Sequence, residues 1–171
     1  MTVISGTVYW NKTVVPHRFN ESEPLKWTID IGNLGKKDIK LLETVGLGHR
    51  VKNKAEGIGT KGADSDDPRG HFITFSTRVE RPNGRGTNKP PRFIDAEKNE
   101  LHPATNEWLG NGSKVNVSFE GWDSQYGKTA TIQTIQIVDR KEYVVETSDD
   151  ELDVVPGGFV NDDDEIPFPS N

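Results

Sequence analysis

The chain has 171 residues, and its lack of cysteine excludes disulfide bonds and cysteine-ligated zinc sites. It begins without a charged and apolar leader and contains no apolar run of about 20 residues, so we expect one soluble, cytoplasmic domain with no membrane partner. The net charge of −6 is unevenly distributed, because residues 1–141 carry all 21 Lys and Arg against 17 Asp and Glu, whereas residues 142–171 carry ten carboxylates and no basic side chain.

Short β-rich segments separated by Gly, Pro and Asn dominate residues 1–141, which predicts an all-β barrel or sandwich with one short helix. The first strand is expected at residues 3–10. Apolar residues occupy every second position from Leu25 to Ile31, so this segment is predicted to be a strand with one apolar and one polar face.

A short amphipathic helix is predicted at residues 36–45, where Ile39 and Leu42 lie near one side and lysines lie opposite. Gly46 supplies a plausible C-terminal stop. The polar, glycine-rich residues that follow, up to Gly70, are expected to form a long mobile loop.

The next predicted strand, residues 71–80, separates into a core face and a solvent face. The core face carries Ile73, Phe75 and Val79, and the other carries Phe72, Thr74, Ser76 and Arg78. Residues 81–86 then read as a turn, 92–95 as a short return strand and 97–112 as an irregular connection.

The last two strands are predicted around residues 115–119 and 129–140, joined by a polar connection at residues 121–128. In the final strand Ile132 is followed by Ile135 and Ile137, which breaks strict alternation and indicates a β-bulge near Gln133 and Thr134.

Positive charge is concentrated in residues 36–92, which hold 13 basic and 7 acidic side chains, a net charge of +6. Such a stretch is typical of a surface that follows a phosphate backbone, although basic loops are also common on ordinary soluble proteins. The candidate DNA-contacting cations are Lys12, Arg18, Lys26, Arg78, Arg81, Arg85, Lys89, Arg92 and Lys128.

Proteins that hold single strands also use aromatic side chains as stacking platforms. Trp122 and Tyr126 lie in the polar connection and are the favoured stacking candidates; Tyr9 and Phe72, on the polar sides of their strands, are weaker ones. A further set shares faces with Ile and Val and is assigned to the core: Trp27, Phe75 and Phe119. Trp10 and Trp108 remain unassigned.

Two stretches of the body resemble the single-stranded DNA-binding proteins of T7-like tailed phages. One is Lys26-Trp27-Thr28-Ile29-Asp30-Ile31 running into a helix, and the other is Gly112-Ser113-Lys114-Val115-Asn116-Val117 before the Trp122 connection. The resemblance implies a five-stranded OB-fold barrel at residues 1–141, sequence-independent binding in DNA replication, recombination and repair, and homodimers. It implies no cofactor and no catalytic residue.

The same resemblance implies that residues 142–171 form a disordered acidic tail that contacts the replicative polymerase and the helicase-primase. The expected partner-binding residues are Asp162, Asp163, Asp164, Glu165, Ile166, Pro167 and Phe168, which also look like the tip of bacterial single-strand binding proteins. Three residues, Pro169 to Asn171, follow the phenylalanine, so the terminal carboxylate does not sit on Phe168. As an internal polyanion, the tail is also expected to compete with DNA for the basic surface.

Two other functions fit parts of the sequence. A nuclease would use Asp64, Asp66 and Asp67 as metal ligands, although their spacing matches no motif and acidic residues beside Pro68 are typical of a solvated turn. A protein-interaction module would act through the tail alone. The four histidines are scattered singly without ligand spacing, so no metal site is expected.

Overall fold

The computed structural model describes residues 2–142 and Pro156, so the predicted tail residues 162–168 lie outside the described residues. The described part is mostly β, with one α-helix, α1 (Lys36–Thr44). Short 3-10 helices occupy Gly48–Arg50, Pro82–Gly84 and Asn106–Trp108. The strands are β1 (Thr2–His17), β2 (Lys26–Gly32), β3 (Lys52–Asn53), β4 (His71–Arg78), β5 (Arg92–Ile94), β6 (Glu100–Leu101), β7 (Lys114–Ser124) and β8 (Gly127–Asp139).

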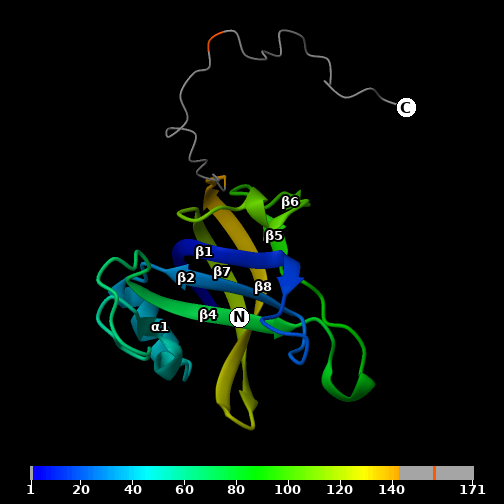
Figure 1. The fold of residues 1–171 in the computed structure, drawn as a ribbon, viewed down its shortest axis with the longest axis horizontal. Helices are drawn as coiled ribbons and strands as arrows, with labels where there is room; N and C mark the ends of the chain where they lie inside the picture. Colours follow the sequence, from blue (N-terminus) through cyan, green and yellow to red (C-terminus); the bar gives the residue numbers. More distant parts are fainter. Residues whose placement is uncertain (1, 143–155, 157–171) are drawn as a thin grey trace.

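Five long strands form the barrel, within a sheet ordered β3-β4-β2-β1-β7-β8-β5-β6 (Figure 1). Neighbouring strands in the described part of the chain pair antiparallel, except that β5 runs parallel to β8. This is the predicted OB-fold. β3 covers only the start of β4, and β5 covers only residues 134–136 of β8. In the described part of the chain, β4 and β8 are in contact but do not share a hydrogen-bond ladder.

The core consists of the side chains that alternate inward along these strands. Ile29, Ile73 and Val117 are almost completely buried, and the rings of Phe75 and Phe119 pack with their centroids 5.4 Å apart. Trp27, Phe75 and Phe119 are buried as predicted. Burial of this alternating apolar face is what fixes the strand register.

The helix and the bulge confirm two local predictions. Leu42 of α1 is buried, and Gly46 ends the helix with a φ of +85°, a conformation that glycine adopts at little cost. In the β7–β8 ladder, Ser118 faces Thr134 whereas Phe119 faces Ile132, which leaves Gln133 as the extra residue. This bulge lets both Ile132 and Ile135 enter the core.

Several predicted boundaries were wrong. β1 continues to His17 rather than ending at Trp10, because an irregular register at Trp10 (φ +47°) allows pairing with β2 to resume at Lys12. The predicted connections at residues 46–70 and 97–112 contain the short strands β3 and β6. The polar segment 121–128 is not a connection, since β7 and β8 extend through it as a tight hairpin.

In the described part of the chain, no helix is long and apolar enough to cross a membrane.

Candidate nucleic-acid interface

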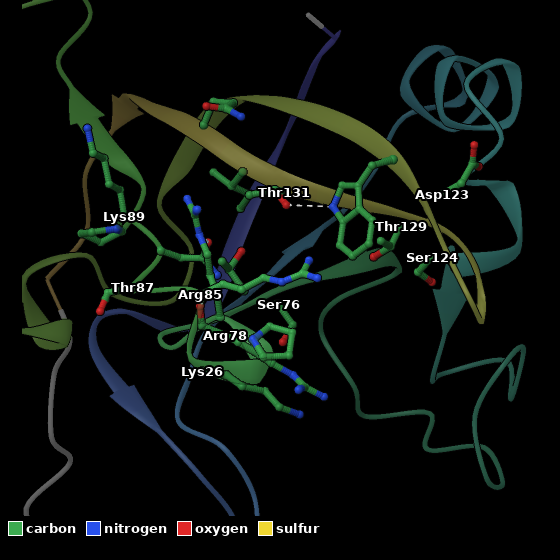
Figure 2. Close-up of a pocket in the computed structure, with 18 of the residues that line it drawn as sticks. Lys26, Ser76, Arg78, Arg85, Thr87, Lys89, Asp123, Ser124, Thr129 and Thr131 are labelled. Atoms are coloured by element: carbon green, nitrogen blue, oxygen red, sulfur yellow. Dashed lines mark hydrogen bonds between the residues drawn. The ribbon is translucent and has the colours of Figure 1, made fainter.

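A pocket of about 1230 Å³ opens where β4, the β4–β5 loop and the β7–β8 hairpin meet (Figure 2). Figure 1 shows the hairpin in yellow, projecting beyond the barrel, and the β4–β5 loop in green. Seven cationic residues line this basic pocket: Lys26, Arg50, Arg78, Arg81, Arg85, Lys89 and Arg92. Among the described residues, Asp123 is the only carboxylate that lines the pocket. The pocket is therefore strongly electropositive.

The β4–β5 loop supplies three of these cations, Arg81, Arg85 and Lys89, and Asn88 holds the loop in place. The Asn88 backbone N–H donates to the Val79 carbonyl (2.8 Å), and its side-chain amide donates to the Arg78 carbonyl (2.8 Å). The Asn88 side-chain oxygen accepts a hydrogen bond from Arg81 Nε (3.0 Å). These bonds fold the loop back along the end of β4, so its arginines face the pocket rather than extending away from it.

The β7–β8 hairpin carries the two exposed rings of the pocket. Trp122 lies opposite Thr129 and donates from Nε1 to Thr131 Oγ1 (3.0 Å), the dashed contact in Figure 2. Its side chain is 51% exposed, and Tyr126 at the hairpin tip is 86% exposed. Both rings are accessible, and the Trp122 hydrogen bond fixes its indole in one orientation before any ligand arrives.

Arg50 is a pocket residue that the sequence analysis missed. It ends the 3-10 helix Gly48–Arg50 and donates from Nε to the Lys128 carbonyl (2.7 Å), which ties this helix to the hairpin. Lys128 itself does not line the pocket, and its Nζ lies 3.6 Å from Asp123 Oδ1. Lys128 thus partly offsets the negative charge of Asp123.

The structure brings together eight of the predicted DNA-contacting residues and leaves five outside the pocket. Those inside are Lys26, Arg78, Arg81, Arg85, Lys89, Arg92, Trp122 and Tyr126. Those outside are Tyr9, Lys12, Phe72, Lys128 and Arg18. Lys12 lies opposite Thr28 on the β1–β2 ladder, and Arg18 directly follows the end of β1.

The expectation that Tyr9 and Phe72 project toward solvent was wrong, because Arg69 covers this part of the sheet. The Arg69 guanidinium lies 4.3 Å from the Trp10 ring centroid and 3.8 Å from that of Phe72. Phe72 is 3% exposed. Tyr9 is also buried, and its hydroxyl donates to the Pro68 carbonyl (3.1 Å). Neither ring offers a free face for stacking.

Arg69 also accounts for the acidic residues in its loop. Its side chain donates two hydrogen bonds to Asp67 (2.8 and 2.9 Å) and one to Asp30 (2.9 Å), and its backbone N–H donates to Asp67 Oδ1 (3.0 Å). Hydrogen bonds from Arg69 hold the pKa of the Asp67 carboxyl below its usual range. Burial opposes ionisation of Arg69, but its bonds to Asp67 and Asp30 raise the pKa of the guanidinium.

The other two carboxylates considered as metal ligands are placed differently. Asp64 accepts a hydrogen bond from the Asp66 backbone N–H (3.1 Å). Within residues 2–142 and Pro156, no group of three or more His, Asp or Glu side chains could hold a metal ion. Asp67 is engaged as a structural ion-pair partner of the barrel.

Fold and pocket together define an OB-fold protein with a cationic, aromatic binding pocket. Comparison with solved structures finds the same fold in the single-stranded DNA-binding protein of bacteriophage Enc34 in complex with single-stranded DNA. The TM-score is 0.54 at 14% identity, over 82% of this chain and 86% of that chain. A C-terminal truncation of the Enc34 protein gives a TM-score of 0.51 at 13% identity, over 82% and 86% of the two chains.

The T7 single-stranded DNA-binding protein gp2.5 is also found, with a TM-score of 0.48 at 14% identity over 94% of this chain and 98% of that chain. No protein-family profile and no curated protein sequence matches the chain. The two Enc34 structures confirm, as a likeness of fold, the resemblance to phage single-stranded DNA-binding proteins expected from the sequence.

Proposed function

We propose that this protein binds single-stranded DNA without sequence preference in the basic pocket. The observation that carries the proposal is the convergence of seven cations and two exposed aromatic rings on one pocket of an OB-fold barrel. Cationic grooves with stacking rings are the arrangement that holds unpaired strands. The Enc34 protein, which shares the fold, has a structure in complex with single-stranded DNA.

In this proposal the cations and the rings have separate tasks. Arg78, Arg81 and Arg85 bind phosphate oxygens, which positions the strand but carries no sequence information. Trp122 and Tyr126 stack on bases, and stacking tolerates every base because each has a π-face. Because both contacts are indifferent to base identity, binding is sequence-independent.

The wider role we propose is in phage DNA replication, recombination and repair in the host cytoplasm, without catalytic activity and as a homodimer. The acidic tail, through Asp162 to Phe168, recruits the polymerase and the helicase-primase and competes with DNA for the basic pocket. Support for the tail's role comes from composition, since ten carboxylates stand beside a body in which residues 36–92 carry a net charge of +6.

The test is a titration of the full chain with oligothymidylate at several salt concentrations, followed by tryptophan fluorescence. For single strands, the logarithm of the binding constant falls with a slope of roughly −0.7 per neutralised phosphate, so seven contacts would give about −5. A matched RNA oligonucleotide measures the preference between the two nucleic acids.

Absence of quenching at low salt would overturn the proposal, and would favour an interaction module acting through the tail. Cleavage of the oligonucleotide that requires magnesium would favour the nuclease instead.

A further inference from the structure

Two cations face each other at the edge of the basic pocket. Lys26 of β2 lies directly opposite Arg78 of β4, and both residues line the pocket. In the described part of the chain neither forms an ion pair. Like charges directly opposite on neighbouring strands destabilise a sheet. A bound anion between them would relieve this repulsion, so Lys26 and Arg78 are suited to bind an anion.

The row continues onto β1, where His17 lies opposite Lys26. Because neighbouring strands are spaced by about 4.8 Å, the three residues span roughly 10 Å across the sheet. Burial, and then the positive charge of Lys12 and of Lys26, lowers the pKa of His17. Burial penalises the charged imidazolium most, and the neighbouring cations add to this effect because protonation would place a further positive charge beside them.

Beyond His17 lies an exposed ring that the sequence analysis did not single out. Phe19 is 87% exposed, and its ring packs edge-on against His17 with centroids 5.4 Å apart and an interplanar angle of 81°. Hydrogen bonds hold the part of the β1–β2 loop that follows Phe19. Asn20 Oδ1 accepts from the Ser22 and Glu23 backbone N–H groups (both 3.1 Å), and the Leu25 carbonyl accepts from the Val79 N–H (3.0 Å). An apolar ring is thus exposed to solvent beside His17, next to the two cations Lys26 and Arg78.

We infer that the bound strand leaves the basic pocket across the β1–β2 loop, with a phosphate between Lys26 and Arg78 and the next base stacked on Phe19. This inference rests on the proposed function and extends its site beyond the pocket lining. It assigns a base-stacking role to Phe19, which does not line the pocket.

The test compares Phe19→Ala, Phe19→Trp and the control Ile58→Ala, which trims a side chain of the glycine-rich loop that is 49% exposed. Affinity is measured by anisotropy of a fluorescently labelled oligothymidylate that is long enough to span both sites. Loss of one stack weakens binding by about 5- to 150-fold in Phe19→Ala. Phe19→Trp and Ile58→Ala are expected to bind like the wild type. Because Phe19 is exposed, its variants should keep the wild-type midpoint of thermal unfolding.

A double-variant cycle with Trp122→Ala sharpens the result, because two separate stacks predict additive losses. Wild-type affinity in Phe19→Ala, with DNA binding by the wild-type protein intact, would overturn the inference and leave the proposed function standing. An equal loss in Ile58→Ala would also overturn it. Absence of binding by the wild-type protein itself would instead remove the proposed function.

Discussion

Replacing Trp122 with alanine separates the two physical roles that an indole can have in this fold. The side chain is half exposed on the β7–β8 hairpin, and its one hydrogen bond, to Thr131, also lies in an exposed position. Loss of such a bond and of one cross-strand contact costs about 1 kcal/mol of stability. Loss of one base stack costs roughly 1 to 3 kcal/mol of binding, or about 5- to 150-fold in affinity. Trp122→Ala should therefore stay folded and bind weakly.

The assay is anisotropy of a labelled oligothymidylate at fixed salt, with urea unfolding of the same samples. Trp122→Phe retains a ring and should recover most of the affinity. Trp27→Ala is the contrasting control, because Trp27 is 8% exposed and removing a buried aromatic side chain costs about 3 to 5 kcal/mol of stability. The reasoning is refuted if Trp122→Ala binds as tightly as the wild type, or if it loses as much stability as Trp27→Ala.

Three further predictions concern the remaining charges. Arg69→Ala leaves the carboxylates of Asp30 and Asp67 without their shared ion-pair partner, and should lower the free energy of unfolding by about 3 kcal/mol in a urea titration. An unchanged midpoint of unfolding would contradict a stabilising role for these ion pairs. Because the folded-state pKa of Asp67 lies below its ordinary value of 3.8, its ionised form stabilises the protein above that pH, and the contribution is lost as pH falls through the folded pKa. Asp67→Asn should then show a flatter loss of thermal stability on acidification than the wild type, and parallel curves would rule this out. Deleting residues 143–171 should tighten DNA binding and flatten its salt dependence, as measured by the same anisotropy titration; equal or weaker affinity would remove the competitor role of the tail.

Local sequence patterns were sufficient to predict the core of this fold, because alternating burial along a strand appears in the sequence as alternating apolar and polar residues. The alternation through Trp27 and Ile29 predicted β2, and the broken alternation after Ile132 predicted the bulge that the β7–β8 register contains. The helix end at Gly46 followed from the same kind of local rule.

Residues whose environment depends on distant segments could not be predicted in this way. Phe72 occupies a position that alternation assigns to the solvent face, and only the return of the loop carrying Arg69 buries it. Arg50 reaches the hairpin through a bond to a carbonyl 78 residues away, and no local pattern records that contact. The polar residues around Trp122 indicated a connection, but pairing with β8 satisfies their backbone groups as a strand.

The absence of a shared ladder between β4 and β8 bears on how one pocket can accept bases of unequal size. Ser76 of β4 and Thr131 of β8 both line the pocket, and among the described residues no hydrogen bond of the sheet joins these two strands. Purines are broader than pyrimidines, and a continuous ladder would hold the opening at one width. An adjustable gap of this kind would suit the proposed binding of single strands without sequence preference.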